Sequence, residues 1–263
     1  MNTKSSFATA VVAAVAAIGL SAAFQPAPAS ASVIDNFTVP VTATASGGSG
    51  VFSVSASNGT FGPFNQRTAG AIWSQNTTRA NRTVSAISTG TGVGRLQLFQ
   101  SSTSSGSTNP EQAYSEFLYE NAGGAPVNLQ TLGTAFSITT LATSTTGDFR
   151  GFVDLYDEGG VVAQYTLSTM WAPNTTTTIP FTVFTDASPT LDLTKVQVVY
   201  VGIRNQNELV GATLNSATAE FASIAVVPEP TQIVSLAGIG LAYGAFRLRK
   251  LRRDRGTSEA AKA

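Results

Sequence analysis

The sequence predicts an all-β fold, an antiparallel β-sandwich of the jelly-roll type, between an N-terminal signal helix and a single C-terminal transmembrane helix. From residue 33 to residue 226, short segments rich in Val, Ile, Phe and Thr alternate with Gly, Asn, Ser and Pro. No stretch of this region keeps apolar residues at helical spacing over about ten positions. The chain contains 27 serines, 35 threonines and 24 glycines, and only 11% of its residues are charged. This composition suits β-strands better than helices.

The expected strands are short and evenly spaced, as in a sandwich. A hairpin is expected around Asp157-Glu158-Gly159-Gly160, because a short Gly-containing turn separates two strand-like segments. Residues 44–50 and 101–110 are rich in Ser and Gly and are expected to form surface loops. The expected strands cover residues 33–39, 51–57, 71–75, 82–88, 95–100, 113–120, 135–140, 151–157, 161–167, 177–184, 196–203 and 217–227.

The absence of two residue types excludes several classes of enzyme. The chain contains no cysteine and no histidine. Disulfide frameworks, thiolate metal sites, Ser-His-Asp hydrolases and His-ligated zinc or iron are therefore excluded. No cofactor is expected.

The first 31 residues have the pattern of a secretory signal peptide. Lys4 precedes an apolar run from Phe7 to about Phe24, and Ala29-Ser30-Ala31 follows. A positive start, an apolar stretch and small residues at the end are typical of a cleaved export signal. We expect cleavage after Ala31.

The C-terminus combines an apolar segment with a basic cluster. Residues 233–246 carry no charge, and as a helix they would be about 21 Å long. Flanking residues extend the expected transmembrane helix to about 231–248. Lys and Arg directly after a span stay in the cytoplasm, so the main domain is expected outside. The basic residues are Arg247, Arg249, Lys250, Arg252, Arg253 and Arg255.

Residues 227–255 resemble the PEP-CTERM sorting signal of bacterial exported proteins. Pro228-Glu229-Pro230 precedes the short helix and the basic end, which is the order found in that family. Pro228 and Pro230 cannot donate backbone hydrogen bonds and hold Glu229 in an extended segment. The resemblance implies recognition by a membrane-embedded exosortase that processes its substrates near this tripeptide, in organisms that make exopolysaccharide.

The predicted domain organisation therefore has four parts. Residues 1–31 are the signal peptide, 32–227 the β-sandwich, 228–255 the sorting signal and 256–263 a short tail. The sandwich loosely resembles galactose-binding-like jelly rolls, which include many carbohydrate-binding modules; residues 33–39 and 176–203 carry this resemblance. Its net charge is negative, which argues against a nucleic-acid partner.

Carboxylates and aromatic rings are the candidate functional groups of the sandwich. Asp154, Asp157 and Glu158 form the densest acidic cluster, which we interpret as a solvated hairpin tip, with calcium binding as an alternative. Sugars pack their CH faces on aromatic rings, and polar neighbours bind their hydroxyls. Trp171, placed before Pro173 and expected to be exposed, and Tyr156 are the candidate ligand residues. The other residues considered are Trp73, expected in the core, Tyr165, Asn174 and Arg79.

These observations predict a protein without catalytic activity that is exported, crosses the membrane in transit, and acts at the cell surface or in the extracellular matrix by holding polysaccharide. Two alternatives stay open. One is a carboxylate-based polysaccharide hydrolase or lyase, which two carboxylates facing each other across a groove would favour. The other is a structural surface protein without a ligand.

Overall fold

A computed structural model describes residues 31–47, 51–74, 82–100, 112–205 and 216–228. Residues 31–227 form one compact unit. The described residues do not include residues 1–30 of the expected signal peptide or any residue after Pro228. The expected transmembrane helix and the basic cluster therefore lie outside them. Within the described part of the chain, no helix is long and apolar enough to cross a membrane.

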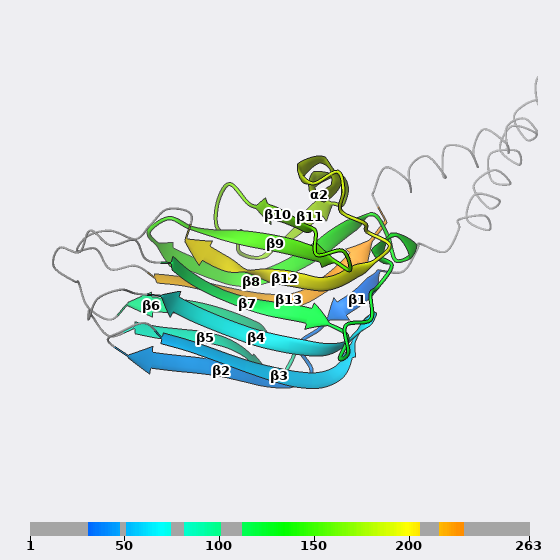
Figure 1. The fold of residues 1–263 in the computed structure, drawn as a ribbon. Helices are drawn as coiled ribbons and strands as arrows, with labels where there is room; N and C mark the ends of the chain where they lie inside the picture. Colours follow the sequence, from blue (N-terminus) through cyan, green and yellow to red (C-terminus); the bar gives the residue numbers. More distant parts are fainter. Residues whose placement is uncertain (1–30, 48–50, 75–81, 101–111, 206–215, 229–263) are drawn as a thin grey trace, which may run out of the picture. The chain divides into compact units, whose positions relative to one another are not determined.

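The compact unit is a sandwich of two antiparallel sheets (Figure 1). Sheet A has seven strands in the order β11-β8-β13-β6-β5-β2, and β1 pairs with the end of β13 that β6 leaves free. Its strands are β1 (Ser32–Asp35), β2 (Pro40–Gly47), β5 (Arg82–Thr89), β6 (Gly94–Gln100), β8 (Ala135–Thr146), β11 (Thr175–Pro180) and β13 (Ser216–Val227).

Sheet B has six strands in the order β10-β9-β12-β7-β4-β3. The 3₁₀ helix η1 (Leu129–Thr131) and the short helix α2 (Thr182–Ala187) lie in connections between strands. The strands of sheet B are β3 (Val51–Phe61), β4 (Phe64–Ser74), β7 (Gln112–Glu120), β9 (Phe149–Asp157), β10 (Val162–Thr166) and β12 (Val196–Asn205).

Alternating residues of the two sheets form the core. In β7, Ala113, Ser115, Phe117 and Tyr119 are buried, and the residues between them are on the outer face. Period-two alternation of this kind is what a strand with one buried face requires. Aromatic rings meet between the sheets: Trp171 contacts Phe221 edge to face, with ring centroids 5.7 Å apart.

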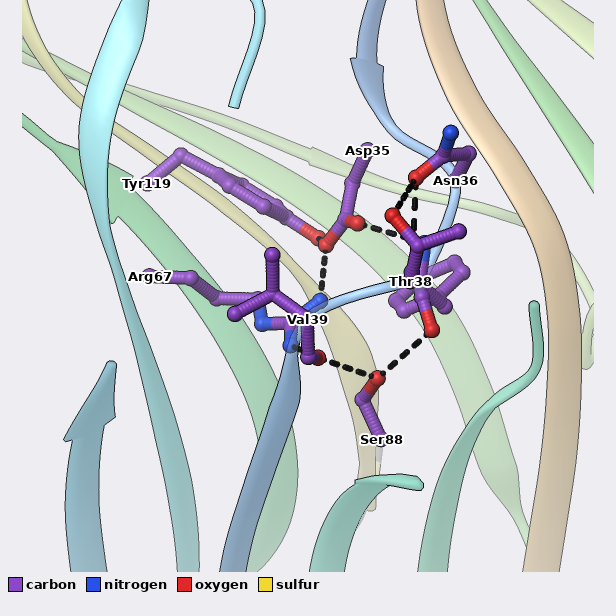
Figure 2. Close-up of polar contacts among 8 residues, drawn as sticks. Asp35, Asn36, Thr38, Val39, Arg67, Ser88 and Tyr119 are labelled. Atoms are coloured by element: carbon purple, nitrogen blue, oxygen red, sulfur yellow. Dashed lines mark hydrogen bonds and ion pairs between the residues drawn. The ribbon is translucent and has the colours of Figure 1, made fainter. Parts of the chain in front are cut away.

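One charged cluster lies inside this core (Figure 2). Asp35 of β1 forms an ion pair with Arg67 of β4, and both side chains are almost completely buried. The Tyr119 hydroxyl donates to the same Asp35 oxygen at 2.9 Å. Arg67 also donates to the Val39 carbonyl, which accepts a second hydrogen bond, 2.8 Å long, from Ser88 Oγ. The cluster therefore ties β1, β4, β5 and β7 together.

Aromatic rings complete the surroundings of the buried guanidinium. The centre of the Arg67 guanidinium lies 4.9 Å from the Phe61 ring centroid and 5.6 Å from those of Phe37 and Phe117. Phe37 has a left-handed backbone, with φ of 56°, and its amide donates to Asp35 Oδ1 at 2.6 Å. An aspartate that accepts from the backbone two residues later stabilises such a turn. Asp35 thus fixes the turn after β1 as well as the arginine.

The predicted antiparallel sandwich is confirmed, with several corrections to its elements. Residues 44–47, expected in a loop, belong to β2. Their Ser and Gly content suggested a flexible segment, but pairing with β5 provides backbone partners for the strand. β4 begins at Phe64, seven residues before the expected strand start at 71, and β8 continues to Thr146. Residues 182–184, expected in a strand, form the start of α2.

We predict that Arg67→Met lowers the free energy of unfolding by about 3–5 kcal/mol, because it leaves the Asp35 carboxylate buried without its partner. Tyr119→Phe should cost about 1–2 kcal/mol, since one buried hydrogen bond is lost. Urea denaturation measures both. Arg95→Met is the matched control: Arg95 pairs with Glu220 at the surface, so the cost should stay below about 1 kcal/mol. Equal losses in Arg67→Met and Arg95→Met would contradict the role of the cluster.

Candidate functional site

The outer face of sheet B carries an open hollow of about 270 Å³. Four adjacent strands contribute its walls, and alternation turns the contributing residues away from the core. The lining is aromatic and polar. It consists of Tyr114 and Glu116 from β7, Phe152, Asp154 and Tyr156 from β9, Gln164 from β10, and Tyr200 and Arg204 from β12.

An ion pair crosses the hollow from β12 to β9. Arg204 Nη1 donates to Asp154 Oδ2 at 2.9 Å, and Gln164 Nε2 donates to the same oxygen at 3.2 Å. The guanidinium also donates to Thr166 and lies over the Phe152 ring, 4.4 Å from its centroid. Burial raises the pKa of Asp154, and the hydrogen bonds from Arg204 and Gln164 oppose that rise. The pair holds both side chains in defined positions.

Glu116 lies next to this ion pair, and its charged form is disfavoured. Burial and the nearby Asp154 carboxylate raise the pKa of Glu116 to about 8, and Arg204 only partly opposes them. At neutral pH the Glu116 carboxyl is therefore mostly protonated and can donate a hydrogen bond. Glu116 and Asp154 are on strands separated only by β12, so two carboxyl groups face the same hollow.

Three tyrosines supply aromatic surface around the carboxyl groups. The rings of Tyr156 and Tyr200 are tilted against each other, with centroids 5.3 Å apart. Burial raises the pKa of Tyr200 to about 12 and also raises those of Tyr114 and Tyr156. Their hydroxyl groups consequently stay neutral in the pH range where Glu116 titrates. The hollow offers ring faces together with hydroxyl, amide and carboxyl groups.

Trp171 supports the hollow from the other side of the sheet. It is 1% exposed, and its indole Nε1 donates to the Gly202 carbonyl at 2.9 Å. A Cβ at Gly151 would lie 2.6 Å from the indole ring, so only glycine leaves room for it. The expectation that Trp171 is exposed is wrong, because a bulky ring fills the space that Gly151 leaves on the inner face. Trp73 is buried in the core, as predicted.

The other sequence candidates divide between the hollow and the hairpin. Tyr156 lines the hollow. Asp154 does so as well, and is 5% exposed, so its interpretation as part of a solvated tip is wrong. The hairpin itself is confirmed, with β9 paired to β10 around residues 158–161. Tyr165 packs against Phe184, Asn174 lies at a turn with φ of 50°, and Arg79 is outside the described residues.

Asp157 is a structural residue of the hairpin and is only 4% exposed, so its interpretation as part of a solvated tip is also wrong. Its two carboxylate oxygens accept from the backbone amides of Val161, at 2.9 Å, and Asp192, at 3.0 Å. A second hollow, of about 390 Å³, lies beside it, next to Glu158 and Lys195. Among the described residues, no group of three or more acidic side chains is arranged to hold a metal ion. Asp157 organises the turn through its hydrogen bonds to the backbone.

The sequence does not predict Glu116, Tyr114, Tyr200 and Arg204 as residues of the site. One feature of the sequence could have indicated Glu116 and Tyr114. In residues 113–120, every second position is Ala, Ser, Phe or Tyr on the buried side, and Tyr114, Glu116, Leu118 and Glu120 alternate with them. This pattern places a carboxylate beside an aromatic ring on one face. The pairing of β7 with β12, which brings Arg204 and Tyr200 beside them, cannot be read from local sequence.

Comparison with known proteins identifies no family for this chain. No family model and no curated protein matches its sequence. Among solved structures, it is similar to a family 30 carbohydrate-binding module of a Clostridium thermocellum cellulosomal cellulase, with 14% identity, coverage of 76% of this chain and 99% of that one, and a TM-score of 0.38.

Two further similar structures are glycoside hydrolases. A family 12 xyloglucanase from Bacillus licheniformis has 10% identity and a TM-score of 0.31, over 69% of this chain and 98% of that one. An exo-beta-agarase has 11% identity and a TM-score of 0.32, over 72% of this chain. The chain spans 23% of the length of that agarase. The similar structures are thus carbohydrate-binding modules and glycoside hydrolases.

We predict that Glu116 makes stability depend on pH. Its folded pKa of about 8 lies above the usual value of 4.5, so the folded protein keeps a proton that the unfolded chain has lost. The free energy of unfolding should therefore fall as pH rises from about 4.5 to about 8 and level off above that range. The total fall should reach a few kcal/mol, since each pKa unit corresponds to about 1.4 kcal/mol.

Urea denaturation at pH 5, 7 and 9 measures this dependence. Glu116→Gln should flatten the profile, because the amide stays neutral at every pH. Glu158→Gln, at the exposed hairpin, leaves Glu116 in place and should keep the wild-type profile. A Glu116→Gln profile as steep as that of the wild type would contradict the raised pKa.

Proposed function

We propose that the sandwich binds polysaccharide through the hollow on the outer face of sheet B. The observation that carries this proposal is the combination of three tyrosines with Glu116, Gln164 and the Asp154–Arg204 pair in one open hollow. Sugar rings present apolar CH faces to aromatic side chains and hydroxyl groups to polar ones. The fixed ion pair and the protonated carboxyl supply acceptors and donors without mobile side chains.

We predict that Tyr156→Ala and Tyr200→Ala each weaken polysaccharide binding about tenfold, the loss expected for an aromatic anchor of a binding site. Affinity electrophoresis of the full chain in detergent, in gels containing neutral soluble polysaccharides, measures the effect. Arg95→Ala, on the outer face of sheet A, should leave mobility unchanged. Equal retardation of wild type, Tyr156→Ala and Tyr200→Ala in gels that retard the wild type would place the ligand elsewhere.

We also propose that the chain is exported and sorted by an exosortase-type system. The proposal rests on the signal-peptide pattern of residues 1–31 and on the resemblance of residues 227–255 to the PEP-CTERM signal. The compact unit ends at Val227, immediately before Pro228, and this boundary supports a signal that can be removed without damage to the sandwich. The protein would then act at the cell surface or in the extracellular matrix.

We predict that deletion of residues 228–263 changes the distribution of the protein between membrane, cell-surface and medium fractions. Without the sorting signal, the exported sandwich should pass into the periplasm or medium and be depleted from the membrane and surface. Fractionation followed by immunoblotting measures the distribution. Identical distributions of the truncated and complete chains would contradict the sorting role.

The two carboxyl groups support a second candidate function, hydrolysis of a glycosidic bond. A protonated Glu116 has the state needed for a general acid, and Asp154, paired with Arg204, is the candidate for the base or nucleophile. Reducing-end assays on neutral polysaccharides test this candidate. Activity should disappear, by at least about a hundredfold, in both Glu116→Gln and Asp154→Asn. Absence of any product from the wild type, under conditions where it binds polysaccharide, would leave binding as the function.

A further inference from the structure

Glu116 lies in a row of facing residues that crosses the whole of sheet B. Strand pairing places Gly70 and Gly202 directly opposite Glu116 on either side. Beyond them, Val54 pairs with Gly70, and Phe152 pairs with Gly202 and then with Thr166. Six strands have five spacings, so the row is about 24 Å long, several times the width of one sugar ring.

The two glycines make room for the side chains beside them. A Cβ at Gly70 would lie 3.3 Å from Glu116 Oε1, and a Cβ at Gly202 would lie 2.5 Å from the Phe152 ring. Any larger residue at Gly70 would push against the carboxyl, and one at Gly202 would displace the ring on which Arg204 stacks. Glycine at these positions thus provides the space that the Glu116 side chain occupies beside Gly70 and that the Phe152 ring occupies beside Gly202.

The far end of the row is an exposed apolar edge. Val54 is 60% exposed and Phe52 is 73% exposed, both on edge strand β3 and both facing the same side as the hollow. Phe52 pairs with Ile72, which pairs with Tyr114 of the hollow. A line of apolar and aromatic side chains therefore runs beside the row from the hollow to the edge of the sheet.

The charges that face Glu116 nearly cancel at neutral pH. β9 contributes Asp154 and Tyr156, β12 contributes Arg204 and Tyr200, and β4 contributes uncharged Thr68, Gly70 and Ile72. β7 contributes Tyr114 and, four residues further along the same face, Glu120. Asp154 and Arg204 neutralise each other, and the Glu116 carboxyl is mostly protonated because its pKa is about 8. No net positive charge remains beside the row, so the charge of an acidic ligand would not be compensated.

From these observations we infer the class of ligand: an uncharged, linear glycan that lies across the strands along the Gly70–Glu116–Gly202 row and extends over Phe52, with the Glu116 carboxyl donating a hydrogen bond to it. This inference rests on the proposed polysaccharide-binding function and narrows it. Acidic glycans are excluded by the missing counter-charge. A long chain is favoured over a single sugar because the row and the apolar edge continue well beyond the hollow.

Isothermal titration calorimetry on the full chain in detergent tests the inference. Hexasaccharides of neutral β-glucan, xylan and agarose, with oligomers of alginate and polygalacturonate as charged probes, are titrated at pH 6.5 and pH 9.5. For the neutral glycan that binds at pH 6.5, affinity should fall at least about tenfold at pH 9.5, because only the protonated fraction of Glu116 binds. Glu116→Gln should bind with equal affinity at both pH values.

Two further variants test the path of the glycan. Phe52→Ala should weaken binding of the hexasaccharide about fivefold. The affinity for the disaccharide of the same glycan should stay unchanged, because only a long chain reaches the edge. Phe99→Ala is the matched control: Phe99 is 41% exposed on the outer face of sheet A, so neither ligand should be affected. A second copy of the chain is the competing occupant of this edge. Light scattering of the wild type and of Phe52→Ala tests it. A wild-type dimer that becomes a monomer in Phe52→Ala would assign the edge to a second copy of the chain.

The outcomes separate this inference from the function on which it rests. Absence of binding to every probe at both pH values would overturn polysaccharide binding itself. Preference for alginate or polygalacturonate, or a pH profile that Glu116→Gln does not change, would leave polysaccharide binding intact and overturn the inferred ligand class.

Discussion

The buried contact of Arg67 with Asp35 and Tyr119 fixes the register on which the outer face of sheet B depends. Arg67 and Tyr119 are direct partners across the β4–β7 pair, and Asp35 bridges them. A shift of β4 by one residue would turn Arg67 and the other inward-facing side chains of that strand to solvent. Such a shift would leave the buried Asp35 carboxylate without its arginine partner, which would strongly destabilise the fold. The core cluster therefore selects one alignment of these strands.

The position of the hollow follows from this alignment of β4 with β7. Once Arg67 faces Tyr119, Gly70 must face Glu116 three positions along, and the next pairing places Gly202 on the other side of the carboxyl. The inner and outer faces of the sheet are linked again at Gly202, where Trp171 binds the carbonyl from below and Phe152 covers the glycine from above. The packing of the core thus determines the positions of the strands that carry the polar residues of the hollow.

Local sequence patterns were sufficient for the architecture and insufficient for the site. Alternation and turn residues predicted the sandwich and the β9–β10 hairpin, because both depend on near neighbours in the chain. Trp171 was misplaced because its burial depends on Gly151 and Gly202, and the space that glycine provides is visible only after the strands are paired. Glu116 was missed for the same reason, since Asp154 and Arg204 reach it through pairings between distant segments.

We propose that the outer face of sheet B binds an uncharged glycan at a protonated Glu116. The decisive measurement is a crystal structure of the β-sandwich, residues 32–227, soaked with the neutral oligosaccharide that binds most tightly. The oligosaccharide should cross β4, β7 and β12, with one of its oxygens within hydrogen-bond distance of the Glu116 carboxyl and a sugar ring against Tyr156 or Tyr200. An oligosaccharide bound on the outer face of sheet A, or at the hairpin beside Asp157, would contradict it.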